Sequence, residues 1–396
     1  MELAINGGKP IRNKMLAYGR QWIDEEDIQA VVNVLKGDYL TTGPSIEAFE
    51  KTVAEYVGVK YAVAVSNGTA ALHCALFGCG IKEGDEVIVT PMTFAASSNA
   101  ILYLGAKPIF VDIDPLTYNI NPDEIEKKIT DKTKAIVAVD FAGHPVQLER
   151  IMAIAEKYKL KVVEDAAHAL GSEYKQKKIG TFAHATTFSF HPVKPITTGE
   201  GGMIVTDDAE IYQRMSMFRT HGITRSKDLV INPNEGDWYY EQQLLGYNYR
   251  MTDIQAALGI SQMKRIDEFI ARRREIVQKY NEAFAEIEEI ITPYEAEDCK
   301  SGYHLYVIRI KPEKLKVGRR EIFDALKAEN IGVNVHYIPV YRHPYYKQMN
   351  IDGSSCDVTE NVYNTMITLP LFPKMSEEDI EDVIVAVKKV ISYYSR

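Results

Sequence analysis

Short apolar runs alternate with amphipathic stretches along the first half of the chain. In 25–35 the apolar residues recur every three or four positions, which predicts a helix, whereas the continuous apolar run 61–65 predicts a buried strand. The same patterns predict helices at 25–35, 45–57, 69–77, 95–104, 123–129 and 148–158, and strands at 61–65, 86–90, 108–111, 135–139, 161–164, 186–190 and 203–206. Short strands separated by helices form a mostly parallel sheet that is covered by helices on both faces. The sequence therefore predicts an α/β protein with a seven-stranded sheet.

The pattern changes near Thr252. From Asp253 to about Ile287 it predicts one long helix, which we expect to link a large domain (1–252, including the N-terminal segment) to a smaller one (253–396). The smaller domain is expected to be α+β, with extended segments at 303–310 and 333–337 and helices at 319–329 and 376–391. No repeat or low-complexity linker separates the two parts, so we expect them to pack firmly.

Length and charge restrict the class of protein. The 396 residues exceed one ordinary core, and with 46% apolar and 26% charged residues the chain can bury a large interior. A net charge of −9 argues against a nucleic-acid-binding surface. The densest basic run, Arg272–Arg274, is interpreted as one solvated helix face.

Neither a membrane segment nor a metal site is expected. No apolar run approaches the roughly 20 residues that span a bilayer, and the N-terminus lacks the features of a signal peptide. The four cysteines, at 74, 79, 299 and 356, have no zinc-ligand spacing and are interpreted as reduced thiols of a cytoplasmic protein.

The candidate chemistry centres on Lys194. Pro192 and Pro195 flank it and forbid a continuous helix or strand there, so the lysine lies on a restrained loop just after a predicted strand. Asp165 directly follows another predicted strand, about 30 positions earlier. A lysine and a carboxylate of this kind are the pair that a pyridoxal phosphate (PLP) enzyme needs: the lysine forms a Schiff base and the carboxylate keeps the pyridine nitrogen protonated. Taken alone, Lys194 could equally be a surface lysine.

Five motifs make the interpretation specific. They span 66–72 (SNGTAAL), 90–94 (TPMTF), 164–169 (EDAAHA), 189–202 (SFHPVKPITTGEGG) and 246–251 (GYNYRM). In this order the chain resembles the sugar aminotransferases of the DegT/DnrJ/EryC1/StrS family, which belong to fold type I of the PLP enzymes. Within the family the motifs are most similar to those of the nucleotide-sugar 4-aminotransferases of pseudaminic acid biosynthesis. The likeness runs nearly from end to end.

The resemblance implies a role for each motif. Lys194 and Asp165 would be catalytic, and the cofactor would be bound by Gly68, Thr69, Ala70, Phe94, Asp165, His168, Ser189, Lys194 and, from the partner chain of a homodimer, Asn248. Substrate contacts are expected at His191, Arg250, His336, Tyr337 and Tyr341. Without the resemblance, the same residues have ordinary structural explanations: a helix cap at 66–69, a core phenylalanine, a hydrogen-bonded histidine and a turn asparagine.

The resemblance also implies a reaction. The chain would move an amino group from L-glutamate to C4 of UDP-2-acetamido-2,6-dideoxy-β-L-arabino-hex-4-ulose, with the cofactor alternating between PLP and pyridoxamine phosphate. Another UDP-4-keto sugar, such as a 4-keto-pentose or a D-series sugar, remains an alternative acceptor. A sugar 3-dehydratase, which has histidine in place of the lysine, is disfavoured by Lys194. A non-catalytic sugar sensor is disfavoured because Asp165, Ser189 and Lys194 are all present.

Overall fold

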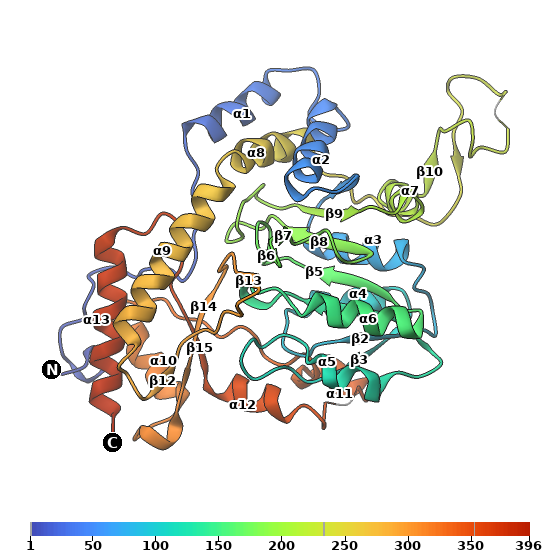
Figure 1. The fold of residues 1–396 in the computed structure, drawn as a ribbon. Coiled ribbons are helices and arrows are strands. Elements are labelled where there is room, and N and C mark those ends of the chain that lie inside the picture. Colours follow the sequence, from blue (N-terminus) through green and yellow to red (C-terminus); the bar gives the residue numbers. More distant parts are fainter. Residues whose placement is uncertain (1, 233, 352) are drawn as a thin grey trace.

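The fold is built on one large sheet. The computed structural model describes residues 2–232, 234–351 and 353–396, and within them seven strands form a sheet in the order β1-β9-β8-β5-β4-β2-β3 (Figure 1). Only β9 runs antiparallel to its neighbours within this sheet. The strands are β1 (Tyr61–Val65), β2 (Glu86–Val89), β3 (Lys107–Phe110), β4 (Thr133–Val139), β5 (Lys161–Asp165), β8 (Ala185–Ser189) and β9 (Gly202–Thr206). The predicted seven-stranded, mostly parallel sheet is confirmed.

Both faces of this sheet are apolar, which explains its continuous hydrophobic strands. In β1, Ala62 and Ala64 pack on one face, while Val63 and Val65 pack on the other, because successive side chains of a strand point to opposite sides. The first face is covered by α2 (Pro44–Val57), α6 (Leu148–Tyr158) and α8 (Asp253–Met263), and the second by α3 (Gly68–Gly78), α4 (Ala96–Tyr103) and α7 (Ala209–Phe218). We call the sheet with these helices the large unit.

Helix caps agree with the sequence pattern. Helix α1 (Glu25–Leu35) begins at a capping box between Asp24 and Asp27, and α8 begins at one between Thr252 and Gln255. The six helices predicted before residue 160 are all present, although the one expected at 123–129 is a short α5 (Pro122–Ile125) followed by a 3₁₀ turn (Glu126–Lys128).

A second core, the small unit, lies below and to the left in Figure 1. Its sheet has the order β12 (Ile290–Ile291), β14 (Tyr306–Ile310) and β15 (Met366–Leu369), and it packs against α10 (Arg319–Ala328) and α13 (Glu377–Tyr394). Leu3 and Leu16 from the start of the chain are buried in this same core, so both termini lie at the small unit. The division of the chain at residue 252 stays a prediction.

The prediction of one continuous helix from Asp253 to about Ile287 is wrong. Helix α8 ends at Met263, and a separate helix α9 (Ile266–Phe284) follows and descends toward α13 (Figure 1). At the break, Arg265 leaves helical geometry with φ −112° and ψ 5°, and its guanidinium forms an ion pair with Asp24 and lies 4.7 Å from the ring centroid of Trp22. The helical pattern continues through the break, but contacts with the N-terminal segment interrupt the helix.

The interpretation of Arg272–Arg274 as a solvated face is also wrong. Arg273 is 1% exposed, and its Nη1 donates hydrogen bonds to the carbonyl oxygens of Leu371 (2.9 Å), His304 (3.3 Å) and Tyr303 (3.4 Å). Because neighbouring helical positions differ by about 100° around the axis, the central residue of three can point inward while the outer two, Arg272 and Arg274, are only partly buried.

The remaining elements are short. The segment expected at 333–337 is not a strand, since only Asn334 pairs there, with Thr368 in an isolated bridge. A second three-stranded sheet has the order β13 (Cys299–Lys300), β6 (Glu173–Tyr174) and β7 (Lys177–Lys178), and β10 (Ile223–Thr224) pairs with β11 (Glu241–Gln242) in a projecting hairpin. Helices α11 (Pro344–Gln348) and α12 (Asp357–Thr365) precede β15.

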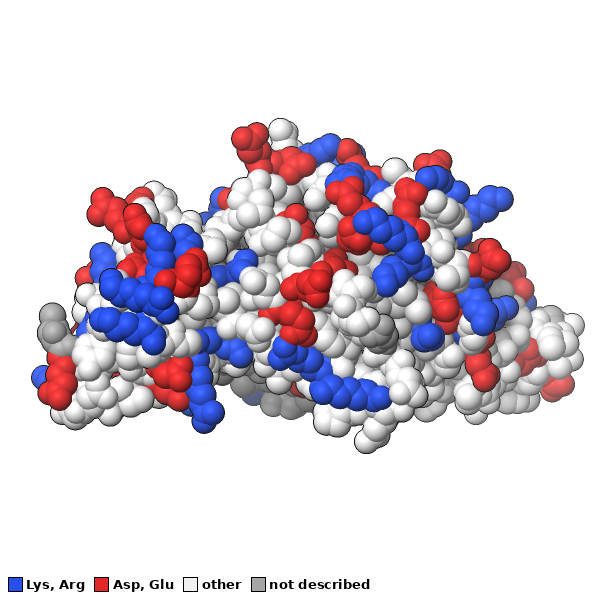
Figure 2. Space-filling model, turned by 90° about the horizontal axis from the view of Figure 1, so that it is seen from below, with Lys and Arg blue, Asp and Glu red and all other residues white. Residues whose placement is uncertain are grey.

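Acidic and basic side chains are mixed on the surface. On the face in Figure 2, Lys and Arg lie among Asp and Glu, and no large region carries a single sign of charge. Among the described residues, no helix is long and apolar enough to cross a membrane.

Candidate active site

The predicted site residues gather at one edge of the large sheet. Strands β1, β8 and β5 all run in the same direction, so their carboxyl ends lie together. Asp165 ends β5, Ser189 ends β8, and Ser66 directly follows β1. Chain segments that are more than 100 residues apart in sequence therefore converge at this edge.

Lys194 lies on a loop that the backbone closes tightly. Phe190 N–H donates to the carbonyl oxygen of Gly201 (2.9 Å) and Thr198 N–H donates to that of Phe190 (3.0 Å), while Lys194 N–H donates to the carbonyl oxygen of His191 (2.9 Å). The side chain is half-buried. Burial lowers the pKa of Lys194 to about 8, and the nearby Asp165 carboxylate limits this shift. A lysine in this state is far easier to deprotonate than one in water.

Asp165 is held by two donors. Its Oδ2 accepts a hydrogen bond from Ser97 Oγ (2.6 Å) and its Oδ1 accepts one from Ala167 N–H (3.2 Å). Thr93 Oγ1 lies 2.7 Å from Ser97 Oγ, and because the Ser97 proton is directed to the carboxylate, the Thr93 hydroxyl donates to Ser97. Burial raises the pKa of Asp165, and the Ser97 hydroxyl, the Ala167 amide and the Lys194 charge oppose this rise.

The tautomer of His168 follows from its partners. Ala142 N–H donates to Nδ1 (3.2 Å), and burial, with the nearby Lys194 charge, lowers the pKa of this histidine well below its usual value. The neutral ring must therefore carry its proton on Nε2, which lies 3.0 Å from Tyr337 Oη and donates to it. The hydroxyl proton of Tyr337 is consequently free to point toward another acceptor.

Gly68 brings the start of α3 against Ser189. A Cβ at Gly68 would lie 2.9 Å from Ser189 Cβ and 3.1 Å from its Oγ, so a side chain there would push the two segments apart. The Asn67 side chain caps α3 by accepting from Ala70 N–H (2.8 Å). The amide of Ala70 is therefore already used, and the amides of Gly68 and Thr69, with the hydroxyls of Thr69 and Ser189, form the group of donors at the helix start.

The other predicted contact residues differ in accessibility. Phe94 is 61% exposed, with its ring centroid 6.0 Å from that of Tyr337, and His191 is also exposed. His336 is buried and its Nδ1 lies 2.9 Å from Thr368 Oγ1, while Tyr341 is buried in the core between α3, α4 and the sheet and donates to Glu360 (2.8 Å). The polar atoms of these two residues are thus bonded within the protein, and their predicted role in substrate binding stays a prediction.

Asn248 lies where the projecting hairpin returns to the sheet. It is exposed and forms an isolated bridge with Thr220, and the next residue, Tyr249, accepts a hydrogen bond from Ser66 N–H (2.8 Å). Arg250, directly after it, is half-buried. The loop therefore lies beside the segment that starts α3.

Sequence reasoning missed Ser97 and the residues of a cavity beside Lys194. The serine is in the first turn of α4 and carries no motif signal except that it follows the 90–94 segment by three residues. The cavity lies between the Lys194 loop, the N-terminal segment and α9; its lining includes Arg20, Trp22, Phe269 and Arg273. These residues come from three distant parts of the chain, so no local pattern could have grouped them.

A helix-covered, mostly parallel sheet with a lysine and a carboxyl group at its carboxyl edge defines a class. It is fold type I of the PLP-dependent transferases, as the resemblance implied. The chain belongs to the DegT/DnrJ/EryC1/StrS aminotransferase family, whose model matches residues 21–388. The predicted family is confirmed.

Three curated relatives cover nearly the whole chain. The spore coat polysaccharide biosynthesis protein SpsC of Bacillus subtilis is 44% identical over 96% of this chain and 98% of its own length. The UDP-4-amino-4,6-dideoxy-N-acetyl-β-L-altrosamine transaminase of Campylobacter jejuni is 38% identical over 93% and 96%. The UDP-4-amino-4-deoxy-L-arabinose–oxoglutarate aminotransferase of Shewanella sediminis is 36% identical over 96% and 99%.

Solved structures of aminotransferases also resemble this chain in fold. Helicobacter pylori PseC, an aminotransferase of pseudaminic acid biosynthesis, has a TM-score of 0.90 at 34% identity, covering 96% of this chain and all of its own. A Streptococcus pneumoniae protein assigned as a sugar aminotransferase, solved in its PLP form, has a TM-score of 0.89 at 33% identity, covering 96% and 99%.

Proposed function

We propose that this protein is a PLP-dependent sugar aminotransferase that moves an amino group from L-glutamate to C4 of UDP-2-acetamido-2,6-dideoxy-β-L-arabino-hex-4-ulose. The product would be UDP-4-amino-4,6-dideoxy-N-acetyl-β-L-altrosamine. The observation that carries the proposal is the pairing of a half-buried Lys194 of lowered pKa with a buried Asp165 at one sheet edge. The altrosamine transaminase of C. jejuni and PseC support this choice of sugar.

The residues at the sheet edge fit the cofactor. The close approach of Gly68 to Ser189 gathers amides and hydroxyls at the start of an α-helix, an arrangement that binds a phosphate group. The buried carboxylate of Asp165 suits a positively charged pyridine nitrogen, which offsets the cost of burying its charge. Phe94 and His168 offer an exposed ring and a buried ring for the two faces of the cofactor.

Lys194 and Asp165 have different roles in the proposed reaction. When bound, the cofactor supplies an electron sink and carries the amino group between the two substrates. Lys194 Nζ removes the proton from Cα of the donor and, in the second half-reaction, delivers a proton to C4 of the sugar. Asp165 keeps the positive charge at the ring nitrogen, and Ser97 and Ala167 hold its carboxylate in place.

Tyr337 can assist as a hydrogen-bond donor. Because His168 Nε2 donates to Tyr337 Oη, the tyrosine proton is available to an oxygen of a bound ligand. Burial raises the pKa of Tyr337, so the hydroxyl keeps its proton at neutral pH. The hydrogen bonds from Ala142 to His168 and from His168 to Tyr337 thus fix the direction of this donor, and Asp165 lies close enough to influence the pKa of Tyr337.

A panel of nucleotide sugars tests the proposal. Purified protein with PLP and L-glutamate is incubated separately with several UDP-4-keto sugars, and products are identified by mass spectrometry and NMR. We expect an amino sugar and 2-oxoglutarate from the L-arabino-hexos-4-ulose. If no 4-keto sugar is aminated while the visible absorbance of bound PLP is present, the acceptor class is wrong.

A UDP-4-keto-pentose is the second candidate acceptor. The S. sediminis aminotransferase, named for 4-amino-4-deoxy-L-arabinose, is nearly as similar as the altrosamine transaminase. The two acceptors differ at C2 and C5, where the hexose carries an N-acetyl group and a methyl group. The same panel separates them by the ratio of kcat/KM.

We further propose that the active unit is a homodimer in which Asn248 reaches the cofactor phosphate of its partner. Asn248 is exposed, and the adjoining hairpin carries the exposed apolar side chains Ile231, Trp238 and Leu245. Such side chains favour burial against a second surface. In a two-fold dimer each chain would contribute the same loop to the other.

Mixing two inactive variants tests this arrangement. Lys194→Ala supplies an intact Asn248, and Asn248→Asp supplies an intact Lys194, while its new charge repels a phosphate. Mixed dimers should regain part of the wild-type activity, because one of their two sites has both residues. An active monomer in sedimentation, or a fully active Asn248→Asp variant, would contradict the shared site.

A further inference from the structure

Two further carboxyl groups lie beside Asp165 and have no place in the mechanism above. Asp140 directly follows β4, and Glu164 precedes Asp165 in β5, the neighbouring strand. Both are 0% exposed, whereas Asp165 is 5% exposed. Because successive side chains of a strand point to opposite sides, Asp140 and Glu164 lie together on one face of the sheet, and the Asp165 side chain lies on the other face at the same strand end.

Two of the four oxygens of Asp140 and Glu164 have conventional donors. Asp140 Oδ1 accepts from Val146 N–H (2.9 Å), and Glu164 Oε2 accepts from Thr186 Oγ1 (2.8 Å). The remaining atoms, Asp140 Oδ2 and Glu164 Oε1, are fully buried and accept no hydrogen bond from any other described residue.

The two carboxyl groups are within hydrogen-bonding reach of each other. Two ionised carboxylates only accept hydrogen bonds, so they cannot bond to one another. One proton removes the conflict, because Asp140 Oδ2–H can donate to Glu164 Oε1 while every other oxygen keeps its donor. Buried polar atoms are rarely left without a partner.

We propose that Asp140 and Glu164 share one proton in the folded protein at neutral pH, and that this acid pair is a positioning element for Asp165. The second half of the proposal rests on the proposed function, while the shared proton does not.

The electrostatic surroundings favour the proton. Burial and the Glu164 charge raise the pKa of Asp140 well above its usual value, and Asp165 adds to this rise. Burial raises the pKa of Glu164 to about 7, opposed by its bonds to Thr186 and Asp140. Among the other groups that face the pair, Cys299 has its own pKa raised and adds no positive charge. The two carboxyls titrate as a pair.

The pair is connected to Asp165 through the backbone. Asp140 N–H donates to the carbonyl oxygen of Asp165 (3.1 Å), so the residue that carries the proton also fixes the end of β5. Holding one proton keeps the net charge of the pair at −1. Loss of it would set two negative charges beside Asp165 and favour protonation of Asp165, which must stay ionised to serve the ring nitrogen.

Infrared spectroscopy of the complete protein detects the shared proton directly. At neutral pH we expect the carbonyl stretch of a protonated carboxylic acid in the wild type, and its loss in both Asp140→Asn and Glu164→Gln. An amide at either position can donate in place of the proton, so both variants should fold. A band that persists unchanged in both variants overturns the proposal.

Thermal unfolding at different pH values provides a second measurement that needs no cofactor or substrate. A carboxyl whose pKa is raised in the folded state holds a proton that the unfolded chain releases, so stability falls as pH rises from about 5 to about 8. The melting temperature of Glu164→Gln should therefore fall less over this range than that of the wild type. The control Glu124→Gln, an exposed residue paired with Lys127, should keep the wild-type slope. Parallel curves for wild type and Glu164→Gln would contradict the shared proton.

The positioning role has its own readout. Asp140→Asn should retain most of the activity, whereas Asp140→Ala, which leaves Glu164 Oε1 without a donor, should lower kcat several-fold with little change in KM for the sugar. In the wild type we expect kcat to fall at alkaline pH, where the acid pair loses its proton. This fall should be absent in Asp140→Asn, because no proton remains to be lost from that side chain. If infrared spectroscopy shows the shared proton but kcat and its pH profile do not respond, the pair is structural only, and the positioning role is rejected.

Discussion

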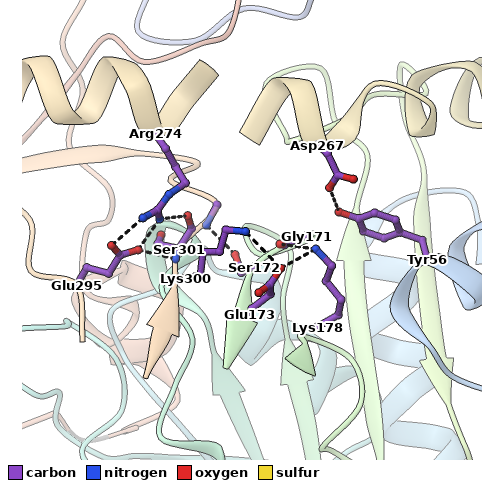
Figure 3. Close-up of polar contacts among 11 residues, drawn as sticks. Tyr56, Gly171, Ser172, Glu173, Lys178, Asp267, Arg274, Glu295, Lys300 and Ser301 are labelled. Atoms are coloured by element: carbon purple, nitrogen blue, oxygen red, sulfur yellow. Dashed lines mark hydrogen bonds and ion pairs between the residues drawn. The ribbon is translucent and has the colours of Figure 1, made fainter. Parts of the chain in front are cut away.

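Two acidic regions of this molecule differ in the burial of their carboxyl groups and in the partners that those groups have. Where α9 crosses the β13-β6-β7 sheet, each carboxylate labelled in Figure 3 has a cation or a hydroxyl partner: Glu295 pairs with Arg274 at 2.6 Å, Glu173 with Lys178 at 2.9 Å, and Asp267 accepts from Tyr56 at 2.7 Å. At the carboxyl edge of the large sheet, Asp140 and Glu164 are completely buried and Asp165 nearly so, and their partners are hydroxyls, amides and one another.

This difference in burial and partners indicates a structural role for the ion-paired region and a chemical role for the carboxyl edge of the large sheet. Ion pairs near solvent contribute about 0–1 kcal/mol each and tolerate substitution, because water compensates for the lost partner. A buried carboxyl is costly unless a partner offsets its desolvation, and its pKa responds strongly to its surroundings. Buried acids without an ion-pair partner, at a sheet edge beside a lysine of lowered pKa, are thus the better indication of function.

The largest effect should come from Lys194. Lys194→Ala is expected to lower transamination by about 10⁴-fold or more, because the proton carrier is lost, while the fold remains intact. The visible absorbance of bound PLP should disappear. Lys178→Ala, which removes a lysine from the paired region, is the matched control and should retain both properties. Cofactor still fixed to another lysine by borohydride would show that Lys194 was misassigned.

Asp165→Asn should have the next largest effect. Without the carboxylate the ring nitrogen loses its proton, and we expect kcat to fall on the order of 10³-fold. Stability should change little or rise, because burial opposes the charge that the variant removes. Rapid-mixing measurement of each half-reaction and thermal unfolding check the two expectations. A variant that works at the wild-type rate rules out this role for Asp165.

The lowered pKa of Lys194 predicts a pH dependence of cofactor capture. The neutral amine reacts, and with a pKa of about 8 its fraction rises by about tenfold per pH unit below that value and levels off above it. The rate at which apoprotein develops the visible absorbance of bound PLP should follow this curve. A normal, fully solvated lysine would instead give a rate that still rises near pH 10, as expected from its usual pKa of about 10.4.

The smallest effect is expected in the paired region of Figure 3. Glu295→Gln removes the ion pair with Arg274 but leaves an oxygen that can accept from Ser301 N–H, so the loss should be about 0–1 kcal/mol. Urea unfolding measures the free energy, and kcat should be unchanged. A loss of several kcal/mol or of activity would remove the contrast between the two regions.

Local patterns predicted the regular parts of the large unit well. Apolar strands such as Tyr61–Val65 and amphipathic helices such as Leu148–Tyr158 were found with boundaries at or near those predicted, because burial on both faces of a sheet leaves a strong signal in the sequence. Lys194 and Asp165 could be chosen because each follows from a strand end and a motif. The break at Arg265 and the inward position of Arg273 could not, since both depend on segments far away in the chain.

By itself, the sequence determined which residues are apolar, where strands and helices form, and which side chains can carry the chemistry. Tertiary structure alone decided the state of those side chains. Ser97 reaches Asp165 across 68 positions, Tyr337 reaches His168 across 169, and Asp140 meets Glu164 only because β4 and β5 are neighbours. Protonation depends on burial and on the nearest charges, and both are set by the packing of distant segments rather than by neighbouring residues in the chain.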